Sequence, residues 1–485
     1  MLSLLLRTLL AVPQQRISNV QHATTQSILT PHDATGLGEN NAVPNRFTKV
    51  EQDDSVCAAG SRQWTGKIEV THGNELFYWY FESQQFAERA PLLIWLTGGP
   101  GEACTVPLLN GGGPCTINDD GTATVNSPHS WTNFSLLILN PLFLLSEIAG
   151  VGFSKSNSKP VHRPKTIDDV TLDLKYFLST FVSEAFPELR GRGFHISGES
   201  YGGIQAISLA YALANPETGG PQPDLSLESL VASSSFADIS YSAPAYYDVL
   251  CGRDHQYLNR TECAIMAAAV PTCETAAVSC RQTTGDEHCW AMAAACAPIL
   301  QFWVPPEKNI VHLEKPCAGF PTCDPRMKAI ETYMNNTEIQ KKLGFAKNHL
   351  VPFVGMDMEV NIYMAMHGSV WLPTSSKYEY LLKNTSVRIL GRGGYLDPDT
   401  PIEGAIRGFE AFHWWGQAQF RASRPEPWYY RGTDGDMVRG GWRRGYSRLW
   451  FVSFDQTGHL IDRDEPESSL HIMKQWIQGG VPVQA

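Results

Sequence analysis

Two segments near the start of the folded part of the chain alternate apolar and polar positions. Residues 64–70 and 76–82 are rich in aromatic and branched side chains, and they flank the turn sequence HGN at 72–74. This arrangement is typical of two antiparallel strands joined by a tight turn. An unbroken apolar run, PLLIWL, follows at 91–96 and ends in a Gly-Gly-Pro-Gly loop. We therefore expect a strand that is buried on both faces and runs into a glycine loop.

Three further short strands are predicted later in the chain. Residues 194–197 lead into the sequence GESYGG and then into a helical run at 204–213. Residues 387–390 and 450–454 also read as strands, and an amphipathic helix is expected at 468–477. Because strands alternate with helices, the pattern predicts an α/β fold with a mostly parallel sheet. Ligand sites in such sheets form beyond the C-terminal ends of the strands.

The strand signal fades between about 238 and 350, where the chain is helical and rich in cysteine. We interpret residues 238–350 as a cap inserted into a single α/β domain that spans 46–485. Residues 1–45 begin with a short apolar run and continue as a polar stretch, which we expect to be a signal or leader segment with room for a propeptide. No run of 18 or more apolar residues occurs, so we predict no membrane span.

The composition excludes several classes of protein. With 43% hydrophobic and 11% aromatic residues, the chain can bury a large core and does not resemble a disordered protein. Its formal net charge is −11 and it has no long basic stretch, which argues against binding to nucleic acid or to an anionic membrane surface. The short basic stretch RGGWRRGYSR at 439–448 is expected to be a solvated loop.

The 11 cysteines indicate an oxidising compartment. Seven of them fall between Cys263 and Cys323, a density that is typical of disulfide-bonded segments. Zinc is the rival explanation, but neither C-x2-C nor H-x3-H spacing occurs there, so we expect no metal or other cofactor. Four Asn-x-Ser/Thr sequons agree with passage through the secretory pathway. They are Asn133, Asn259, Asn335 and Asn384.

The clearest chemical motif is GESYG at 198–202, which fits the pattern G-x-S-x-G. Between a strand and a helix such a turn presents the serine hydroxyl at its tip, and the glycines are needed because the turn is too tight for side chains. The same five-residue pattern also occurs in ordinary loops. The predicted strand before it and the predicted helix after it make Ser200 a candidate nucleophile.

A serine hydroxyl needs an imidazole to accept its proton and a carboxylate to orient that imidazole. In this type of sheet the chain order is Ser, Asp, His, and Asp397 and His459 follow predicted strands in that order. Asp399 competes with Asp397, which also fits an ordinary turn. The oxyanion of an acyl intermediate needs two backbone N–H donors, which we expect from the glycine loop at 98–99 and from Tyr201.

These motifs together resemble the serine carboxypeptidases, and the fungal members most of all. The similarity covers about residues 50–480. It lies in WLTGGPG at 95–101, GESYGG at 198–203, Gly-His at 458–459 and a closing Trp-Ile at 476–477. Family membership implies an α/β-hydrolase fold with helices on both faces of the sheet and a disulfide-rich helical cap.

The resemblance also implies an activity and a site. The reaction is hydrolysis of the C-terminal peptide bond of peptides and proteins through an acyl-enzyme, with no cofactor. A protonated Glu199 donates a hydrogen bond to the substrate carboxylate and an ionised one repels it, so activity is expected to be highest in acid. The resemblance assigns the triad to Ser200, Asp397 and His459, the oxyanion hole to the Gly99 and Tyr201 amides, and the carboxylate pocket to Thr97, Gly98 and Glu199.

Cysteine pairing is likewise implied by the resemblance. Four cap cysteines are spaced by 7, 9 and 7 residues, intervals that occur in the family with nested pairing. Of Cys57, Cys104 and Cys115, one must stay unpaired within the chain, and we favour the bridge Cys57–Cys115. The other expected bridges are Cys251–Cys263, Cys273–Cys296, Cys280–Cys289 and Cys317–Cys323.

The chain departs from the family around the expected carboxylate pocket. Thr97 stands where members often have Asn. Glu102 stands where many have a cysteine, and the late partner of that cysteine is also missing near Met356. Gly111 replaces a Glu that many members pair with the Glu beside the nucleophile, which weakens the case for acid-dependent recognition of a carboxylate. After the catalytic histidine, Leu-Ile-Asp at 460–462 replaces the common Met-Val-Pro.

These departures keep two alternatives open. One is an esterase or acyltransferase on the same fold, and the other is a secreted, catalytically impaired homologue that acts as a binding protein. The sequence NPLFLLSE at 140–147, which separates a predicted strand from a family motif, is a further departure. The secretory features predict a secreted or vacuolar (lysosomal) protein, and no oligomeric state follows from the sequence.

Overall fold

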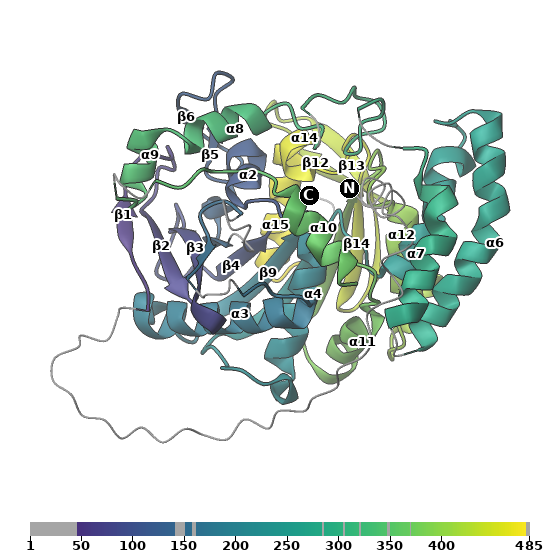
Figure 1. The fold of residues 1–485 in the computed structure, drawn as a ribbon, viewed down its shortest axis with the longest axis horizontal. Helices are drawn as coiled ribbons and strands as arrows, with labels where there is room; N and C mark the ends of the chain where they lie inside the picture. Colours follow the sequence, from purple (N-terminus) through teal and green to yellow (C-terminus); the bar gives the residue numbers. More distant parts are fainter. Residues whose placement is uncertain are drawn as a thin grey trace.

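One large mixed sheet, surrounded by helices, forms the centre of the molecule (Figure 1). The expected leader at 1–45 and residues 141–147 of the family departure lie outside the residues that the structure describes. The structure is a computed structural model, and it describes residues 46–140, 151–157, 162–283, 286–303, 306–319, 322–346, 350–368 and 370–481.

The middle of the sheet is parallel, as the alternation of strands and helices predicts. Interior side chains of these strands are almost fully buried, because the sheet is covered on both faces. The six parallel strands lie side by side in the order β7 (Leu136–Asn140), β4 (Leu92–Leu96), β9 (Gly193–Glu199), β10 (Ser226–Ser233), β11 (Arg388–Gly394) and β14 (Leu449–Phe454).

Antiparallel strands extend the sheet at both ends. The predicted hairpin forms, and it pairs with the parallel part through β7. A small two-stranded sheet of β5 (Cys115–Ile117) and β6 (Thr124–Asn126) lies apart from the main sheet. The antiparallel strands are β1 (Val50–Gln52), β2 (Gln63–Glu69), β3 (Asn74–Phe81) and β8 (Lys155–Ser156) at one end, and β12 (Glu426–Arg431) and β13 (Met437–Tyr446) at the other.

The expectation of a solvated loop at 439–448 is wrong, because most of this stretch belongs to β13. Its glycines suggested a loop, but they have a packing role. A Cβ at Gly440 would lie 2.1 Å from the ring of Trp428, and one at Gly445 would lie 2.3 Å from the ring of Trp450. The glycines therefore make room for neighbouring tryptophans within a strand, which is an accepted reason for glycine in a sheet.

The segment between β10 and β11 contains no strand among its described residues, in line with an inserted helical cap. Its two longest helices, α6 (Arg260–Gln282) and α7 (Asp286–Leu300), pack against each other at the end of the molecule opposite β1 and β2 (Figure 1). The other cap helices are α5 (Ile239–Tyr247), α8 (Met327–Met334) and α9 (Thr337–Lys342).

Helices outside the cap connect the strands and cover the sheet. The helix α4 packs on β9 and β10, and the closing helix is α15, where the sequence predicts one. These helices are α2 (Thr105–Pro107), α3 (Ile167–Thr180), α4 (Tyr201–Ala214), α10 (Met358–Met366), α11 (Ser375–Asn384), α12 (Ile402–Ala411), α13 (Gln417–Ala422), α14 (Ile461–Asp464) and α15 (Pro466–Ile477).

Five disulfides are present, in the five pairs that the family resemblance implies, and Cys104 is buried and unpaired. Three of them tie α6 to its neighbours. This matters because α6 alone, within the described residues, has the length and apolar composition of a membrane span, with a mean hydropathy of 1.4. The absence of a membrane span stays a prediction. The bonds are Cys57–Cys115, Cys251–Cys263, Cys273–Cys296, Cys280–Cys289 and Cys317–Cys323.

Candidate active site

Ser200 occupies a sharp turn between β9 and α4. Its φ of 58° lies in the left-handed region, which a residue with a side chain adopts only under constraint. A Cβ at Gly198 would lie 2.0 Å from the carbonyl oxygen of Gly202, and a Cβ at Gly202 would lie 2.2 Å from that of Leu96. The tightness of the turn therefore requires glycine at 198, and the close approach of the end of β4 requires glycine at 202.

Asp397 and His459 form a buried hydrogen-bonded pair. The imidazole Nδ1 lies 2.8 Å from Asp397 Oδ2, and Asp397 is fully buried. The backbone N–H groups of Asp399 and Thr400 donate to the other carboxylate oxygen at 2.8 and 3.1 Å, and the Thr400 hydroxyl donates to Oδ2 at 2.5 Å. These donors hold the carboxylate in one orientation. The pair therefore has the geometry that holds an imidazole with its Nδ1 proton directed at a carboxylate.

The two alternative acids lie on different sides of the imidazole. Asp397 contacts Nδ1, whereas Asp399 Oδ2 lies 3.9 Å from Nε2, beyond hydrogen-bonding distance. Burial alone would lower the pKa of His459, but the Asp397 carboxylate outweighs it, and Asp399 and Glu199 add to the effect, so the pKa is raised. The arrangement thus stabilises the imidazolium that forms when His459 accepts a proton.

Ser200 and His459 line one cavity. The cavity lies at the C-terminal edge of the sheet, where β4, β9, β10, β11 and β14 end side by side. The backbone of Gly98 lies against the serine, because a Cβ there would lie 2.5 Å from Ser200 Cβ. The described residues that line the cavity are Gly99, Glu102, Glu199, Ser200, Ile310, Val311, Thr322, Asp324, Asp399, His459 and Leu460.

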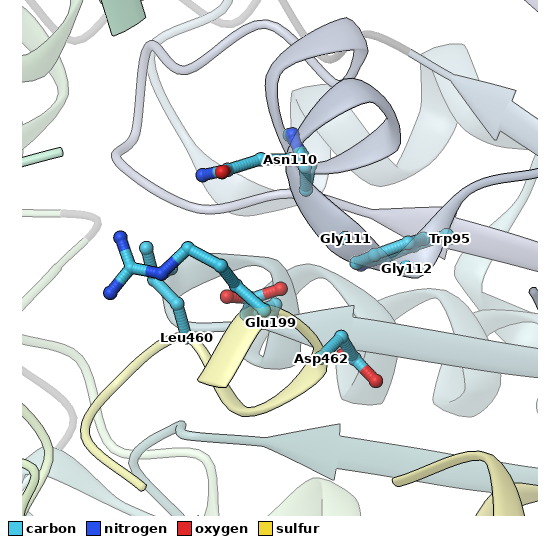
Figure 2. A pocket seen from close by; sticks show the side chains of 9 residues that line it. Trp95, Asn110, Gly111, Gly112, Glu199, Leu460 and Asp462 are labelled. Atoms are coloured by element: carbon cyan, nitrogen blue, oxygen red, sulfur yellow. The ribbon is translucent and has the colours of Figure 1, made fainter. Parts of the chain in front are cut away.

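Glu199 borders this cavity and a second, smaller one. Figure 2 shows its carboxylate between the turn that carries Asn110 and the segment of Leu460 and Asp462. Burial raises the pKa of Glu199 to about 8, and the Asp462 carboxylate adds to the rise. No hydrogen bond joins its side chain to another residue in the described part of the chain. A buried, protonated carboxyl group facing a cavity can donate a hydrogen bond to an anion.

Thr97 and Gly98 do not line either cavity. The Thr97 side chain is buried, and its hydroxyl donates to Glu102 Oε2 at 2.7 Å. Glu102 itself reaches the cavity that contains the serine. The structure therefore directs the Thr97 donor at a neighbouring carboxyl group, whereas the family resemblance placed it at the substrate.

The loss of a Glu at Gly111 is linked to another departure from the family. A Cβ at Gly111 would lie 2.7 Å from the carbonyl oxygen of Asp462 and 2.8 Å from Arg463 Cα. No side chain fits there while residues 460–463 follow their present course. The backbone of residues 462 and 463 therefore fills the space that a side chain at 111 would need. A carboxyl group that pairs with Glu199 has to come from another position in this chain.

An ion pair behind Glu199 was not predicted from the sequence. Arg392, on β11, lies with Nη2 3.0 Å from Asp462 Oδ2, and its side chain is fully buried. Its Nε and Nη1 atoms donate to Ser233 and Ser469, both at 2.7 Å. An arginine two residues beyond the predicted end of the strand at 390 was the only available signal, and it does not reveal its partner. The pair fixes Asp462, whose charge acts on Glu199.

Replacing Arg392 by methionine is expected to lower the free energy of unfolding by about 3–5 kcal/mol, because Asp462 would remain buried without its partner. The double variant Arg392→Met, Asp462→Leu should recover most of this loss. Arg439→Met, which breaks the exposed pair with Asp455, serves as the control and should cost less than about 1 kcal/mol. Urea unfolding measures all three, and equal losses for Arg392→Met and Arg439→Met would contradict the prediction.

The geometry can be compared with known proteins. The sequence model described as serine carboxypeptidase matches residues 55–479. The chain belongs to the serine carboxypeptidase family. It is 27% identical over 424 residues to the vacuolar serine-type carboxypeptidase ATG42 of Saccharomyces cerevisiae, a match that covers 86% of this chain and 79% of that protein.

A second relative and one solved structure add to this. Carboxypeptidase Y of Schizosaccharomyces pombe is 26% identical over 484 residues, which is 96% of this chain but only 46% of that longer protein. The crystal structure of Kex1(delta)p, a prohormone-processing carboxypeptidase from Saccharomyces cerevisiae, superposes with a TM-score of 0.72 at 19% identity. The superposition covers 86% of this chain and 91% of the Kex1(delta)p chain, and it shows that the two share a fold.

As a member of this family, the chain is a serine-type carboxypeptidase with an α/β-hydrolase fold. The family assignment leaves open which residues act and at what pH. Within the described residues no group of three or more His, Cys, Asp or Glu side chains could hold a metal ion.

Proposed function

We propose that Ser200, His459 and Asp397 are the catalytic triad and that Glu199 recognises the free carboxylate of the substrate. The observation that carries this proposal is the shared cavity. Ser200, His459 and Glu199 all line it, and Asp397 holds the imidazole from behind at 2.8 Å. A carboxyl group beside the nucleophile explains why a peptidase would act only on the last bond of a chain.

In the proposed reaction the Ser200 hydroxyl attacks the carbonyl carbon of the C-terminal peptide bond. His459 accepts the serine proton at Nε2 and then donates it to the departing amino group, which leaves as the free amino acid. Water attacks the acyl-enzyme in the second half of the reaction, again with His459 as the base. Asp397 orients the ring and stabilises the imidazolium that forms in both steps.

The backbone amides of Gly99 and Tyr201 are the proposed oxyanion hole. Gly99 lines the cavity, and Tyr201 is the first residue of α4, so its amide lies at the positive end of a helix. Donors at this position stabilise the negative charge that develops on the attacked oxygen. Each is a backbone group, so the assignment does not depend on the side chains at these positions.

A free C-terminal carboxylate should be required for efficient turnover. We expect a blocked dipeptide to be cleaved with a kcat/KM about 100-fold higher than its C-terminal amide, because the amide cannot replace a charged hydrogen-bond acceptor. The assay follows release of the last amino acid from both substrates at pH 5. Equal rates, or faster cleavage of simple esters, would support the esterase or acyltransferase alternative instead.

Passage through the secretory pathway is the proposed route, with a vacuolar or extracellular destination. Disulfides and a vacuolar relative support it. Of the four sequon residues, Asn259 and Asn384 are exposed, so we expect glycans there first. Asn335 is also exposed, but its amide exchanges hydrogen bonds of 2.9 Å with the backbone of Phe353, and Asn133 is only partly exposed.

A further inference from the structure

We propose that Glu102 is the second carboxyl group of the subsite that binds the substrate carboxylate. In its protonated form it donates a hydrogen bond to the free C-terminus of the peptide, beside Glu199. The inference rests on the proposed function and deepens it. It concerns a position where the family resemblance predicts a cysteine and assigns no role in binding.

The position of Glu102 supports this role. The loop after β4 carries Glu102 into the cavity that Ser200, Glu199 and His459 line. Its backbone pairs with Met356, which is where the resemblance placed the missing partner cysteine. Glu102 and Met356 thus stand where the family resemblance predicts a disulfide bond, and the carboxyl group of Glu102 lies at the cavity instead.

Hydrogen bonding at Glu102 leaves one oxygen available. The Thr97 hydroxyl donates to Oε2 at 2.7 Å. The backbone N–H of Gly98 is a further donor to this carboxyl group, and no side-chain donor among the described residues reaches Oε1, the other oxygen. A hydroxyl that donates to one oxygen of a carboxylic acid favours the proton on the other oxygen. Thr97 therefore acts as a positioning residue that turns the acidic O–H toward the cavity.

The Asp324 carboxylate favours the neutral form of Glu102, and His459 opposes it. Glu199 at the end of β9, Asp324 and Asp399 line the same cavity, and His459 faces them. Arg463 lines the neighbouring smaller cavity, and it lies against Asp324 and Asp464 at 3.5 and 3.1 Å.

Burial, with the Asp324 charge as a smaller cause, raises the pKa of Glu102 to about 7. The group is therefore protonated below pH 7 and loses its donor as the pH rises through that value.

This role also accounts for the missing carboxyl group at Gly111. No side chain fits at 111, because residues 462 and 463 fill the space. Glu102 approaches Glu199 from another direction, and its charge contributes to the raised pKa of Glu199. Two neutral carboxylic acids can then donate to one carboxylate, and the ionisation of either would repel it.

The test compares a blocked dipeptide with its C-terminal amide across pH 5 to 8.5, and the measured quantity is the ratio of their kcat/KM values. The titration of His459 affects both substrates and cancels in this ratio. In the wild-type enzyme the ratio should fall about tenfold between pH 6 and pH 8. In Glu102→Gln, whose amide donates at every pH, the fall should be at most threefold, and the ratio at pH 7.5 should exceed that of the wild type.

A second variant keeps the loop in place while removing the carboxyl group. Glu102 and Met356 are opposite each other, flanked by backbone hydrogen bonds of 2.9 Å (Ala103 to Gly355) and 2.8 Å (Asp357 to Gly101). Such non-hydrogen-bonded pairs bring Cα atoms within disulfide range. In Glu102→Cys, Met356→Cys the ratio at pH 6 should fall at least tenfold, while Met356→Cys alone should behave as the wild type.

The outcomes separate the two levels of the proposal. A wild-type enzyme that does not prefer the free carboxylate would overturn the proposed function itself. A wild-type preference whose pH dependence is unchanged in both Glu102 variants would overturn only the role of Glu102. So would equal losses on acid and amide substrates, which indicate a structural role. Losses confined to peptides ending in Lys or Arg would assign Glu102 to the side chain of the substrate and contradict the proposal.

Discussion

Replacing Ser200 by alanine is expected to lower kcat on a blocked dipeptide by about 10⁵- to 10⁶-fold, because the proposed acyl-enzyme forms on this hydroxyl. KM should change less than about threefold, since the carboxylate subsite is left in place. The small residual rate reflects water attack assisted by the oxyanion donors. Release of the C-terminal amino acid measures the effect, and a fluorophosphonate should label the wild type but not the variant.

Ser208→Ala is the matched control, because Ser208 is buried on the same helix but outside the cavity. It should keep wild-type activity and should be labelled by the fluorophosphonate. Turnover by Ser200→Ala at more than about 1% of the wild-type rate would assign the nucleophile to another residue. Absence of labelling in the folded wild type would instead favour the catalytically impaired homologue.

The periodicity of the sequence predicted the elements that carry the site. Alternation identified the first hairpin, and buried apolar runs identified β4, β9 and β14 to within a few residues. Strand β11 extends to Gly394. The sequence pattern predicts an end at 390, because the glycines that follow suggest a turn. Gly391 and Gly393 in fact make room for the rings of Phe409 and Phe451. Glycine marked both loops and close packing, and the sequence alone does not distinguish the two.

The strand β10 was missed for a different reason. It begins with the polar stretch SLES, and its apolar part is only a few residues long. It lies between β9 and β11, and the carbonyl oxygen of its last residue, Ser233, accepts the N–H of Ser200 at 2.9 Å. A short strand in the middle of a sheet is stabilised by its neighbours on both sides, a tertiary effect that leaves little trace in local sequence.

Some residues of the candidate site could be predicted from the sequence, and others depend on tertiary contacts. Motifs brought forward Ser200, Asp397, His459 and Glu199, because each follows a strand in a recognisable order. Glu102 was recorded only as a missing cysteine, since its contact with Thr97 depends on how the loop after β4 folds back. Position along the chain therefore pointed to the groups that we propose to react, whereas their neighbours Glu102 and Arg392 were identified only from the three-dimensional structure.

The departures from the family are coupled in pairs. Gly111 faces the altered segment after His459, and Glu102 faces Met356. The segment after His459 fills the space that a side chain at 111 would need, and the residues at 102 and 356 both lack the cysteine that a bridge between them would require. The departures thus form a consistent rearrangement of one subsite next to an intact set of Ser, His and Asp side chains. Such a rearrangement argues for altered recognition of the substrate more than for loss of catalysis.

Replacing Asp397 by asparagine is expected to lower kcat about 10⁴-fold, whereas Asp399→Asn should lower it less than about tenfold. The Asp399 and Thr400 amides donate to Oδ1, so the asparagine would keep its oxygen there and turn its NH₂ group toward His459 Nδ1. Nδ1 would then have to accept, and the proton would move to Nε2. An imidazole in that tautomer cannot take the proton of Ser200.

Asp399 differs because its carboxylate lies 3.9 Å from Nε2 and makes no contact with Nδ1. Its charge raises the pKa of His459, so Asp399→Asn should lower that pKa and shift the acid limb of the kcat/KM profile to lower pH. Asp397→Asn should leave the thermal transition within a few degrees of the wild type, which shows that the loss is catalytic. If Asp399→Asn proves the more damaging change while both variants remain folded, the triad acid is Asp399 and the orientation proposed for the imidazole is wrong.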